Sequence, residues 1–304
     1  MANKQYLRMA GALLISALTA SGAFAGSTAD RIRENNRLRL AYIPQARPFT
    51  SAAGQNADGY GAALCGEIAA RVKSELALPQ LNVEWVPVSL DTAFTSVSSG
   101  NADILCTPTN ASLDRRRTVG FSIPTFAGGI RAVVRSDAST ALRDVLEATP
   151  SPKNVWRGSP ALNLVEKTRF ATVAGTSSEK WLAAKVSSFK LNTATISVPD
   201  YASGIKFLLE RKIDVFLAER DVVMAAMDDA TSQKVVILKR QLTHEPLALA
   251  LPRGDDDFRL AVDRALAGLS RSGEVSKLFD NAFGAGAEPS NLVRAIWVLN
   301  GIPD

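Results

Sequence analysis

Strand-like and helix-like segments alternate along most of this chain, and this alternation limits its possible folds more than any other feature. Leu38–Tyr42 alternates apolar and polar residues, as a half-buried strand does, and residues 61–76 carry an apolar residue every fourth position, on one helical stripe. The alternation continues through residues 82–106. A chain that alternates in this way favours an α/β fold with mostly parallel sheets flanked by helices.

An irregular stretch divides the alternating pattern into two parts. Residues 136–160 contain the breakers Pro150, Pro152, Gly158 and Pro160, and the strand pattern restarts shortly afterwards. The 304 residues are enough for two compact lobes, and contents of 46% hydrophobic and 21% charged residues argue against disorder. We therefore expect two α/β units.

The N-terminus has the three parts of a cleavable signal peptide. Lys4 and Arg8 supply positive charge, residues 9–20 are apolar, and Ala23-Phe24-Ala25 is a small-residue cleavage signature. A membrane anchor is the alternative, but the apolar run is far shorter than the roughly 20 residues that a membrane-spanning helix needs. No cysteine directly follows the run, as a lipid anchor would require. We expect residues 1–25 to be removed after Ala25 and the mature protein to be free in the periplasm.

The net charge of the chain is only mildly positive. Removing residues 1–25 takes away Lys4 and Arg8 and no acidic residue, so the formal net charge falls from +5 to +3. So small an excess does not indicate a nucleic-acid-binding surface, and we expect no nucleic-acid partner.

Cys65 and Cys106 are the only cysteines in the sequence, and His244 is its only histidine. In an oxidising compartment an even pair of cysteines favours a disulfide, and two buried free thiols are the alternative. A bridge that closes a loop of about 40 residues would stabilise the fold by roughly 4 kcal/mol in the chain-entropy model. Two cysteines and one histidine do not make a convincing metal cluster, so we expect no metal and no cofactor.

Four loops share one position, just past the carboxyl end of an expected strand. They cover residues 43–49, 107–115, 175–178 and 218–220. In open α/β sheets, ligands bind at this end of the strands. The spacing therefore predicts two sheets that face each other across a cleft, with a ligand between them.

A series of short motifs runs in a fixed order from about Leu38 to Phe283. The most specific part comprises residues 99–106 (SGNADILC), 112–115 (SLDR) and 119–124 (VGFSIP). Shorter matches are Pro48-Phe49, 59–61 (GYG), 175–179 (GTSSE), 214–219 (DVFLAE), 251–255 (LPRGD) and 272–274 (SGE). In this order and spacing they resemble the motifs of the family 3 periplasmic solute-binding proteins for polar amino acids. The cysteine before the arginine motif is similar to that of the glutamate/aspartate-type branch.

The resemblance implies a two-lobed, hinged periplasmic-binding-protein fold of type II. It divides the chain into lobe 1 (residues 29–124 and 248–304) and lobe 2 (residues 130–242), with hinge strands near 125–129 and 243–247. It also implies a function, the capture of a small polar solute such as an amino acid or a derivative for an ABC permease in the inner membrane. The lobes would close on the ligand about the hinge. We expect a monomer without enzymatic activity.

The resemblance also places the ligand in the cleft. Arg115 matches the family arginine that holds the α-carboxylate. A planar guanidinium suits this role because it can donate two parallel hydrogen bonds to a carboxylate. The alternative is that Arg115 belongs to a solvated basic turn. Ser177 and Ser178 open a helix, where free N–H groups favour a carboxylate, and helix capping is their other possible role. Glu219 replaces, one methylene longer, an aspartate that pairs with the α-ammonium; an ordinary surface glutamate is the alternative. The residues expected to contact the ligand are Phe49, Leu90, Pro108, Thr109, Asn110, Arg115, Thr176, Ser177, Ser178 and Glu219.

Several positions depart from the pattern of the acidic-amino-acid branch. That branch has arginines at the positions of Ile43 and Ala93, and both are absent here; Arg47 is a candidate to replace the missing cation. Leu90 lies where many relatives stack an aromatic ring on the ligand, and Pro108 replaces a small residue. The resemblance therefore implies that glutamate and aspartate are not the obvious ligands and that a neutral or partly apolar side chain fits better.

Two other functions are possible on the same scaffold. Some relatives are dehydratases, and Glu179 or Glu219 could protonate a leaving hydroxyl if burial raised its pKa. A receptor that hands its closed form to a signalling partner is the second alternative. The motif loops contain no histidine and no cysteine nucleophile, so the sequence favours binding over catalysis.

Overall fold

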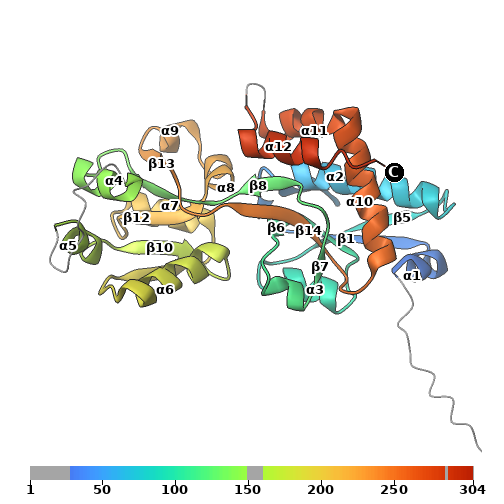
Figure 1. Cartoon of the computed structure of the whole chain (residues 1–304), viewed down its shortest axis with the longest axis horizontal. Coiled ribbons are helices and arrows are strands. Elements are labelled where there is room, and N and C mark those ends of the chain that lie inside the picture. Colours follow the sequence, from blue (N-terminus) through green and yellow to red (C-terminus); the bar gives the residue numbers. More distant parts are fainter. Residues whose placement is uncertain (1–27, 149–159, 285–286, 304) are drawn as a thin grey trace, which may run out of the picture.

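The computed structural model describes residues 28–148, 160–284 and 287–303, which form two lobes joined side by side (Figure 1). Each lobe is built around one β-sheet with helices on both faces. The predicted signal peptide and much of the irregular stretch lie outside the described residues. Among the described residues, no helix combines the length and the apolar character that a membrane crossing needs.

The first sheet has the strand order β5-β1-β6-β14-β7, and β8 also pairs with β14. Its strands are β1 (Arg37–Tyr42), β5 (Asn82–Pro87), β6 (Ile104–Asn110), β7 (Gly120–Phe121), β8 (Phe126–Gly128) and β14 (Glu245–Leu251). Its helices are α1 (Thr28–Asn35), α2 (Tyr60–Glu75), α3 (Ala93–Ser98), the short 3-10 helix η1 (Arg115–Arg117), α10 (Asp256–Ser272), α11 (Glu274–Phe283) and α12 (Asn291–Leu299). Leucine and alanine alternate along β14, so the two faces of the first sheet receive side chains of different size. Leu247, Leu249 and Leu251 pack toward α2, α10 and α11, whereas Ala248 and Ala250 leave room for α3.

The second sheet has the strand order β11-β10-β12-β9-β13. Its strands are β9 (Ile130–Arg135), β10 (Phe170–Val173), β11 (Thr195–Val198), β12 (Val215–Glu219) and β13 (Val235–Gln241). The helices of this lobe are α4 (Thr140–Glu147), α5 (Pro160–Glu166), α6 (Ser177–Phe189), α7 (Tyr201–Leu209), α8 (Arg220–Ala225) and α9 (Asp229–Ser232). Successive residues of β12 enter different cores: Phe216 packs with Ile205 and Leu208 of α7, and Leu217 packs with Leu182 of α6.

The two-lobed α/β fold is confirmed, but the sheets are mixed rather than mostly parallel. β1 is parallel to β5 and β6, and β10 is parallel to β11 and β12. By contrast, β14 is antiparallel to β6, β7 and β8, and β9 is antiparallel to β12 and β13. The reason is the connection between lobes: β9 and β14 begin at the junction where β6 and β12 end, so they must run the opposite way.

The sequence analysis also missed several parts of the fold, among them α5, which begins at Pro160. The loop after β1 forms a small antiparallel sheet of β2 (Gln45–Ala46), β3 (Thr50–Ala53) and β4 (Asn56–Asp58). Helices α1 and α12 were not predicted, although both pack on the core of the first lobe, α1 through Ile32 and α12 through Val293 and Trp297. They are short, and their stability comes from this packing rather than from a long apolar stripe.

The chain passes between the lobes twice, near residues 128–130 and 241–245. The two passages are hydrogen-bonded to each other: the Gln241 side-chain amide donates to the Gly128 carbonyl over 2.9 Å, and the Ile130 N–H donates to Thr243 Oγ1 over 3.0 Å. A Cβ at Gly129 would lie 2.0 Å from the Thr243 carbonyl oxygen, so only glycine allows this approach. The predicted hinge strands, near 125–129 and 243–247, overlap these passages, and the hinge itself stays a prediction.

The predicted disulfide is confirmed: Cys65 of α2 and Cys106 of β6 are bonded, with a sequence separation of 41 residues. Both cysteines are fully buried, between the helical layer and the sheet of the first lobe. The bond therefore ties α2 to the strand that leads into the cleft.

Loss of this disulfide is expected to destabilise the protein strongly. The Cys65→Ala/Cys106→Ala variant should lose about 4 kcal/mol in free energy of unfolding, because the unfolded chain regains the freedom that the closed loop removed. Urea unfolding followed by circular dichroism measures the change, and wild-type protein unfolded with excess reductant is the control. A loss below about 1 kcal/mol would mean that the bridge adds little.

Candidate functional site

The loops predicted to hold the ligand meet in one cavity between the lobes. Its walls come from the segments that follow β1 and β10, from the carboxyl ends of β6 and β12, from α3, and from the start of β14. The inner cavity has a volume of about 90 Å³, and an outer opening of about 450 Å³ shares Leu90, Phe94, Arg115 and Gly175 with it. At the mouth, Lys180 Nζ of α6 lies 3.0 Å from Asp114 Oδ2, so an exposed ion pair connects the lobes.

Arg115 lies where the inner cavity meets the outer opening. Its guanidinium carbon lies 4.4 Å from the centre of the Phe94 ring, and Nη1 donates to the Asn110 carbonyl oxygen over 3.0 Å. Stacking on the ring and one backbone bond fix the plane of the guanidinium and leave other N–H groups to bind a ligand. Burial lowers the pKa of Arg115, although nearby Glu245 and Glu219 oppose this shift.

Glu245 supplies a buried carboxylate at the passage between the lobes. It is 7% exposed, although glutamate is rarely so buried without partners. Oε2 accepts hydrogen bonds from Asn110 Nδ2 over 2.6 Å and from Ser177 Oγ over 2.9 Å, and Oε1 accepts one from Thr243 Oγ1 over 2.7 Å. Asn110 and Ser177 come from different lobes, so Glu245 joins the two walls of the cavity.

Glu219 supplies a second carboxylate, at the end of β12. Oε2 accepts a hydrogen bond from the Tyr201 hydroxyl over 2.6 Å, and Oε1 lies 3.3 Å from Ser178 Oγ and 3.4 Å from Ser177 Oγ. Burial raises the pKa of Glu219, and the charge of Glu245 adds to the increase, while the Tyr201 hydrogen bond opposes it. Burial, and then the charge of Glu219, raise the pKa of Tyr201 well above its usual value, so Tyr201 remains a hydrogen-bond donor.

Thr109 marks a polar position in the wall that nothing in the described chain satisfies. Its hydroxyl oxygen is buried and has no hydrogen-bond partner among the described residues. The neighbouring threonines are satisfied, since Thr107 Oγ1 accepts from the Ile43 N–H over 2.9 Å and lies 2.6 Å from Thr50 Oγ1. Buried hydroxyl groups normally have a partner, and Thr109 lines the cavity, so a ligand atom is the natural one.

The structure brings together nine of the ten residues expected to contact the ligand. Ser178 is the exception: it is buried and is not among the residues that line the cavity, but its hydroxyl supports Glu219. The nine that line the cavity are Phe49, Leu90, Pro108, Thr109, Asn110, Arg115, Thr176, Ser177 and Glu219.

The two positions without arginine also lie in the wall. Ile43 and Ala93 both line the cavity, so this part of it is apolar. Arg47 does not replace the missing cation: it is exposed and lines a different cavity, next to Asp58. Arg47 lies in the turn between β2 and β3. The hypothesis that Arg47 compensates is therefore wrong.

Sequence reasoning missed Tyr201, Glu245 and Phe94, which all line the cavity. Tyr201 follows β11 at the start of α7, which is another loop at the carboxyl end of a strand, and this position could have identified it. Glu245 is an acidic residue inside an otherwise apolar strand, which is a weaker signal. Nothing in the sequence pattern indicated that Phe94 would lie under Arg115.

Glu179, the other glutamate considered as an acid, has a structural role. Oε2 accepts a hydrogen bond from the Gly175 N–H over 2.9 Å, and Oε1 accepts one from the Ser197 hydroxyl. These two hydrogen bonds, that of Ser197 first, lower the pKa of Glu179. It therefore stays ionised and stabilises the first turn of α6. Among the described residues no group of three or more histidine, cysteine, aspartate or glutamate side chains could hold a metal ion.

The family model of the bacterial extracellular solute-binding proteins, family 3, matches residues 38–285. This chain belongs to that family. Its members are periplasmic solute-binding proteins, and the protein is the substrate-binding component of an ABC importer for an amino acid or a related solute.

Curated relatives of this solute-binding protein are named for acidic amino acids. The L-glutamate/L-aspartate-binding protein of Pseudomonas aeruginosa is 27% identical over 94% of this chain and 92% of its own length. The glutamate/aspartate import solute-binding protein of Escherichia coli is 25% identical over 88% of this chain and 83% of its own length. These relatives are substrate-binding proteins rather than enzymes.

Solved structures share the fold of this solute-binding protein. An amino acid ABC transporter substrate-binding protein from Streptococcus pneumoniae, bound to L-arginine, has a TM-score of 0.65 at 19% identity, covering 84% of this chain and 97% of that one. An ancestral amino acid-binding protein, described as a precursor of cyclohexadienyl dehydratase, has a TM-score of 0.66 at 21% identity, covering 85% of this chain and all of that one (100%).

Proposed function

We propose that this solute-binding protein captures an amino acid whose side chain carries no negative charge. Arg115 holds the α-carboxylate, and the α-ammonium lies between the carboxylates of Glu219 and Glu245. Asn110, Thr109 and the α6 N-terminus complete the polar contacts. The lobes close on the ligand because it contacts both of them, which stabilises the closed form over open ones.

The observation that carries the proposal is the pair of carboxylates beside one arginine. Glu219 and Glu245 both line the inner cavity, and Ser177 Oγ lies 3.4 Å from one and 2.9 Å from the other. Buried charges need opposite charges close by, and a ligand ammonium is the partner that two carboxylates favour. A side-chain carboxylate on the ligand would add a negative charge to an inner cavity in which Arg115 is the only arginine among the described lining residues.

The wall around the ligand side chain supports the same conclusion. Ile43, Leu90 and Ala93 are apolar, and the acidic-amino-acid branch has arginines at two of these three positions. The names of the curated relatives point to glutamate and aspartate, so these amino acids are the most informative ones to test.

Glutamine is expected to bind at least about tenfold more tightly than glutamate, because like charges brought together in a buried site cost several kcal/mol. Glutamine and glutamate have almost the same shape, so isothermal titration calorimetry of the two isolates the effect of charge. In the Glu245→Gln variant the preference for glutamine over glutamate should shrink, because one of the two carboxylates that repel the glutamate side chain is gone. Submicromolar binding of glutamate together with weaker binding of glutamine would contradict the proposal.

A dehydratase remains the second candidate because Glu219 is buried and its pKa is raised, as a general acid requires. Glu179 is a poor candidate, since its pKa is lowered. We favour binding because Glu219 is held by Tyr201 and Ser178. Turnover of prephenate or arogenate by wild-type protein, absent from Glu219→Gln, would establish the enzyme instead.

The compartment and the partner follow from the family and the N-terminus. We propose that residues 1–25 are removed after Ala25 and that the mature protein acts as a monomer in the periplasm. It would deliver its ligand to an ABC permease in the inner membrane. Mass spectrometry of the periplasmic protein, which should begin at Gly26, tests the cleavage site.

A further inference from the structure

A second cavity lies at the junction of the two lobes, apart from the ligand cleft. Its volume is about 640 Å³, and it is enclosed by the passages between the lobes, by α8, by α11 and by the segment before α12. In Figure 1, α3 and α6 lie below the connecting strands, whereas α11 and α12 lie above them. Within the described ranges no residue lines both this cavity and the inner cavity of the cleft.

Helix α8 separates the two cavities. Val222 faces the ligand cleft, whereas Asp221, Met224 and Ala225 face the second cavity. Neighbouring residues of a helix point in different directions, so one short helix lines two separate spaces. The second cavity is therefore a distinct feature and not an extension of the amino acid site.

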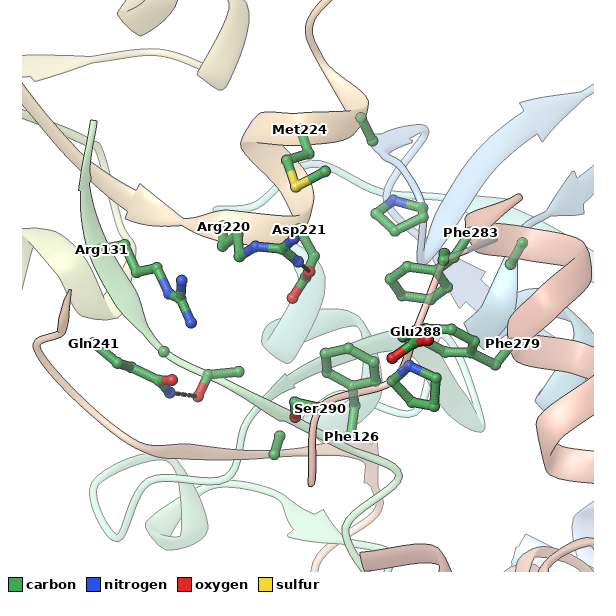
Figure 2. A pocket seen from close by; sticks show the side chains of 18 residues that line it. Phe126, Arg131, Arg220, Asp221, Met224, Gln241, Phe279, Phe283, Glu288 and Ser290 are labelled. Carbon is green, nitrogen blue, oxygen red and sulfur yellow. Dashed lines mark hydrogen bonds and ion pairs between the residues drawn. The ribbon is translucent and has the colours of Figure 1, made fainter. Parts of the chain in front are cut away.

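Arg131 places a guanidinium in the second cavity. It extends from β9 into the open space (Figure 2), and its guanidinium has no hydrogen-bond or ion-pair partner among the described residues. Burial lowers the pKa of Arg131, and the neighbouring Arg220 lowers it further, while Asp221 and Glu147 oppose the shift from a longer range.

The other charged groups of the wall are already paired. Arg220 Nη1 lies 2.8 Å from Asp221 Oδ1, and Glu288 Oε2 lies 3.9 Å from Arg294 Nη2. Gln241 uses its amide N–H to bind the Gly128 carbonyl. Among the described residues of the wall, Arg131 is therefore the one unpaired cation, and the carboxylates of Asp221 and Glu288 would repel a multiply charged anion.

The opposite wall is largely aromatic, with Glu288 beside the rings (Figure 2). Phe126, Phe279 and Phe283 lie together on the side away from Arg131 (Figure 2). The Phe126 and Phe283 rings are stacked with centres 5.5 Å apart, and Met224, which is 46% exposed, adds a flexible apolar surface. A single site thus offers a guanidinium at one end and an aromatic wall at the other.

We propose that this second cavity binds a small monocarboxylate with an aromatic or alkyl body. The carboxylate pairs with Arg131, whose planar guanidinium can donate two hydrogen bonds to it. The apolar body lies against Phe126, Phe283 and Met224. The volume of about 640 Å³ falls in the range of roughly 300–1,000 Å³ that is typical of small-molecule sites.

The test is calorimetric titration of the mature protein with 3-phenylpropionate, indole-3-acetate and octanoate, and with 3-phenylpropanamide as the uncharged match. At least one acid should bind saturably. Its affinity should fall by about tenfold or more in Arg131→Ala, and the amide should bind wild type more weakly than the acid by a similar factor. Arg264→Ala removes an exposed arginine of α10 and should change the affinity less than about twofold.

Two further variants locate the probe and guard against a folding defect. Ala225→Trp fills the second cavity from an exposed position, so it should also block the probe without disturbing a core. Arg115→Ala disables the ligand cleft and should leave probe binding within about twofold of wild type. The proposal is overturned if none of the acids binds up to about 10 mM, if Arg131→Ala binds like wild type, or if Arg115→Ala rather than Arg131→Ala abolishes binding.

Discussion

The Arg115→Ala variant is expected to bind its amino acid about a hundredfold more weakly than wild type, or worse. Removing one partner of a buried, hydrogen-bonded charge pair costs about 2–5 kcal/mol, since the ligand carboxylate is then left without a counter-charge. Arg115 is positioned for this role by the ring of Phe94 and by the Asn110 carbonyl oxygen. Calorimetry with the amino acid that gives the largest thermal shift in a screen measures the effect.

The neighbouring arginine is a matched control for this variant. Arg116 has the same charge and is exposed, and its guanidinium carbon lies 5.4 Å from the centre of the Phe121 ring, away from the cavity wall. Arg116→Ala should therefore bind within about threefold of wild type. Arg115→Lys should fall between wild type and Arg115→Ala, because an ammonium keeps the charge and loses the bidentate geometry. If Arg115→Ala bound like Arg116→Ala, the ligand site would lie elsewhere.

Much of the fold could be predicted because it follows from local patterns. The alternation of strand and helix segments located most of the elements, and the motif order indicated two lobes. The direction of β9 and β14 could not be predicted in this way, since a strand has the same apolar pattern whether its neighbour is parallel or antiparallel. Helices α1 and α12 were missed because each is short and has few buried residues, Thr28 and Ile32 in α1 and Val293 in α12.

The site was partly predictable for a related reason. Loops after strands converge at one edge of each sheet, and the two predicted sheets face each other, so Arg115, Ser177 and Glu219 could be placed together before their contacts were known. Glu245 could not, because its burial depends on hydrogen bonds from Asn110 and Ser177, which are distant in sequence and come from different lobes. The sequence therefore indicates which loops meet at the cleft. It does not indicate that Glu245, a residue within a strand, lies against those loops, because that depends on how the two lobes pack.

The Glu219→Gln variant is expected to be more stable than wild type at neutral pH and to bind its amino acid about tenfold or more weakly. The stability gain, on the order of 1 kcal/mol, arises because an amide avoids the cost of a buried charge. The affinity loss arises because the ligand ammonium loses one of its two carboxylates. Glutamine keeps the size of the side chain and can still accept the Tyr201 hydrogen bond, so the cavity keeps its shape.

The pH dependence of this gain has a definite sign. Burial raises the pKa of Glu219 in the folded protein above the ordinary value of 4.5, so between these two values the folded state holds a proton that the unfolded state has lost. Stability of wild type relative to Glu219→Gln therefore falls as the pH rises through this window, and the difference disappears below the unfolded pKa. Urea unfolding of both ligand-free proteins at acidic and neutral pH measures it.

Glu179→Gln provides a control of opposite sign in the same lobe. The Ser197 and Gly175 hydrogen bonds lower the pKa of Glu179, so its carboxylate stabilises the fold above the ordinary pKa of 4.5, and this contribution is lost as the pH falls through the lowered value. Glu179→Gln should therefore be less stable than wild type at neutral pH, with the deficit shrinking in acid. If Glu219→Gln gained no stability at neutral pH, or lost stability as Glu179→Gln does, Glu219 would not be the destabilising, functional carboxylate that the cleft requires.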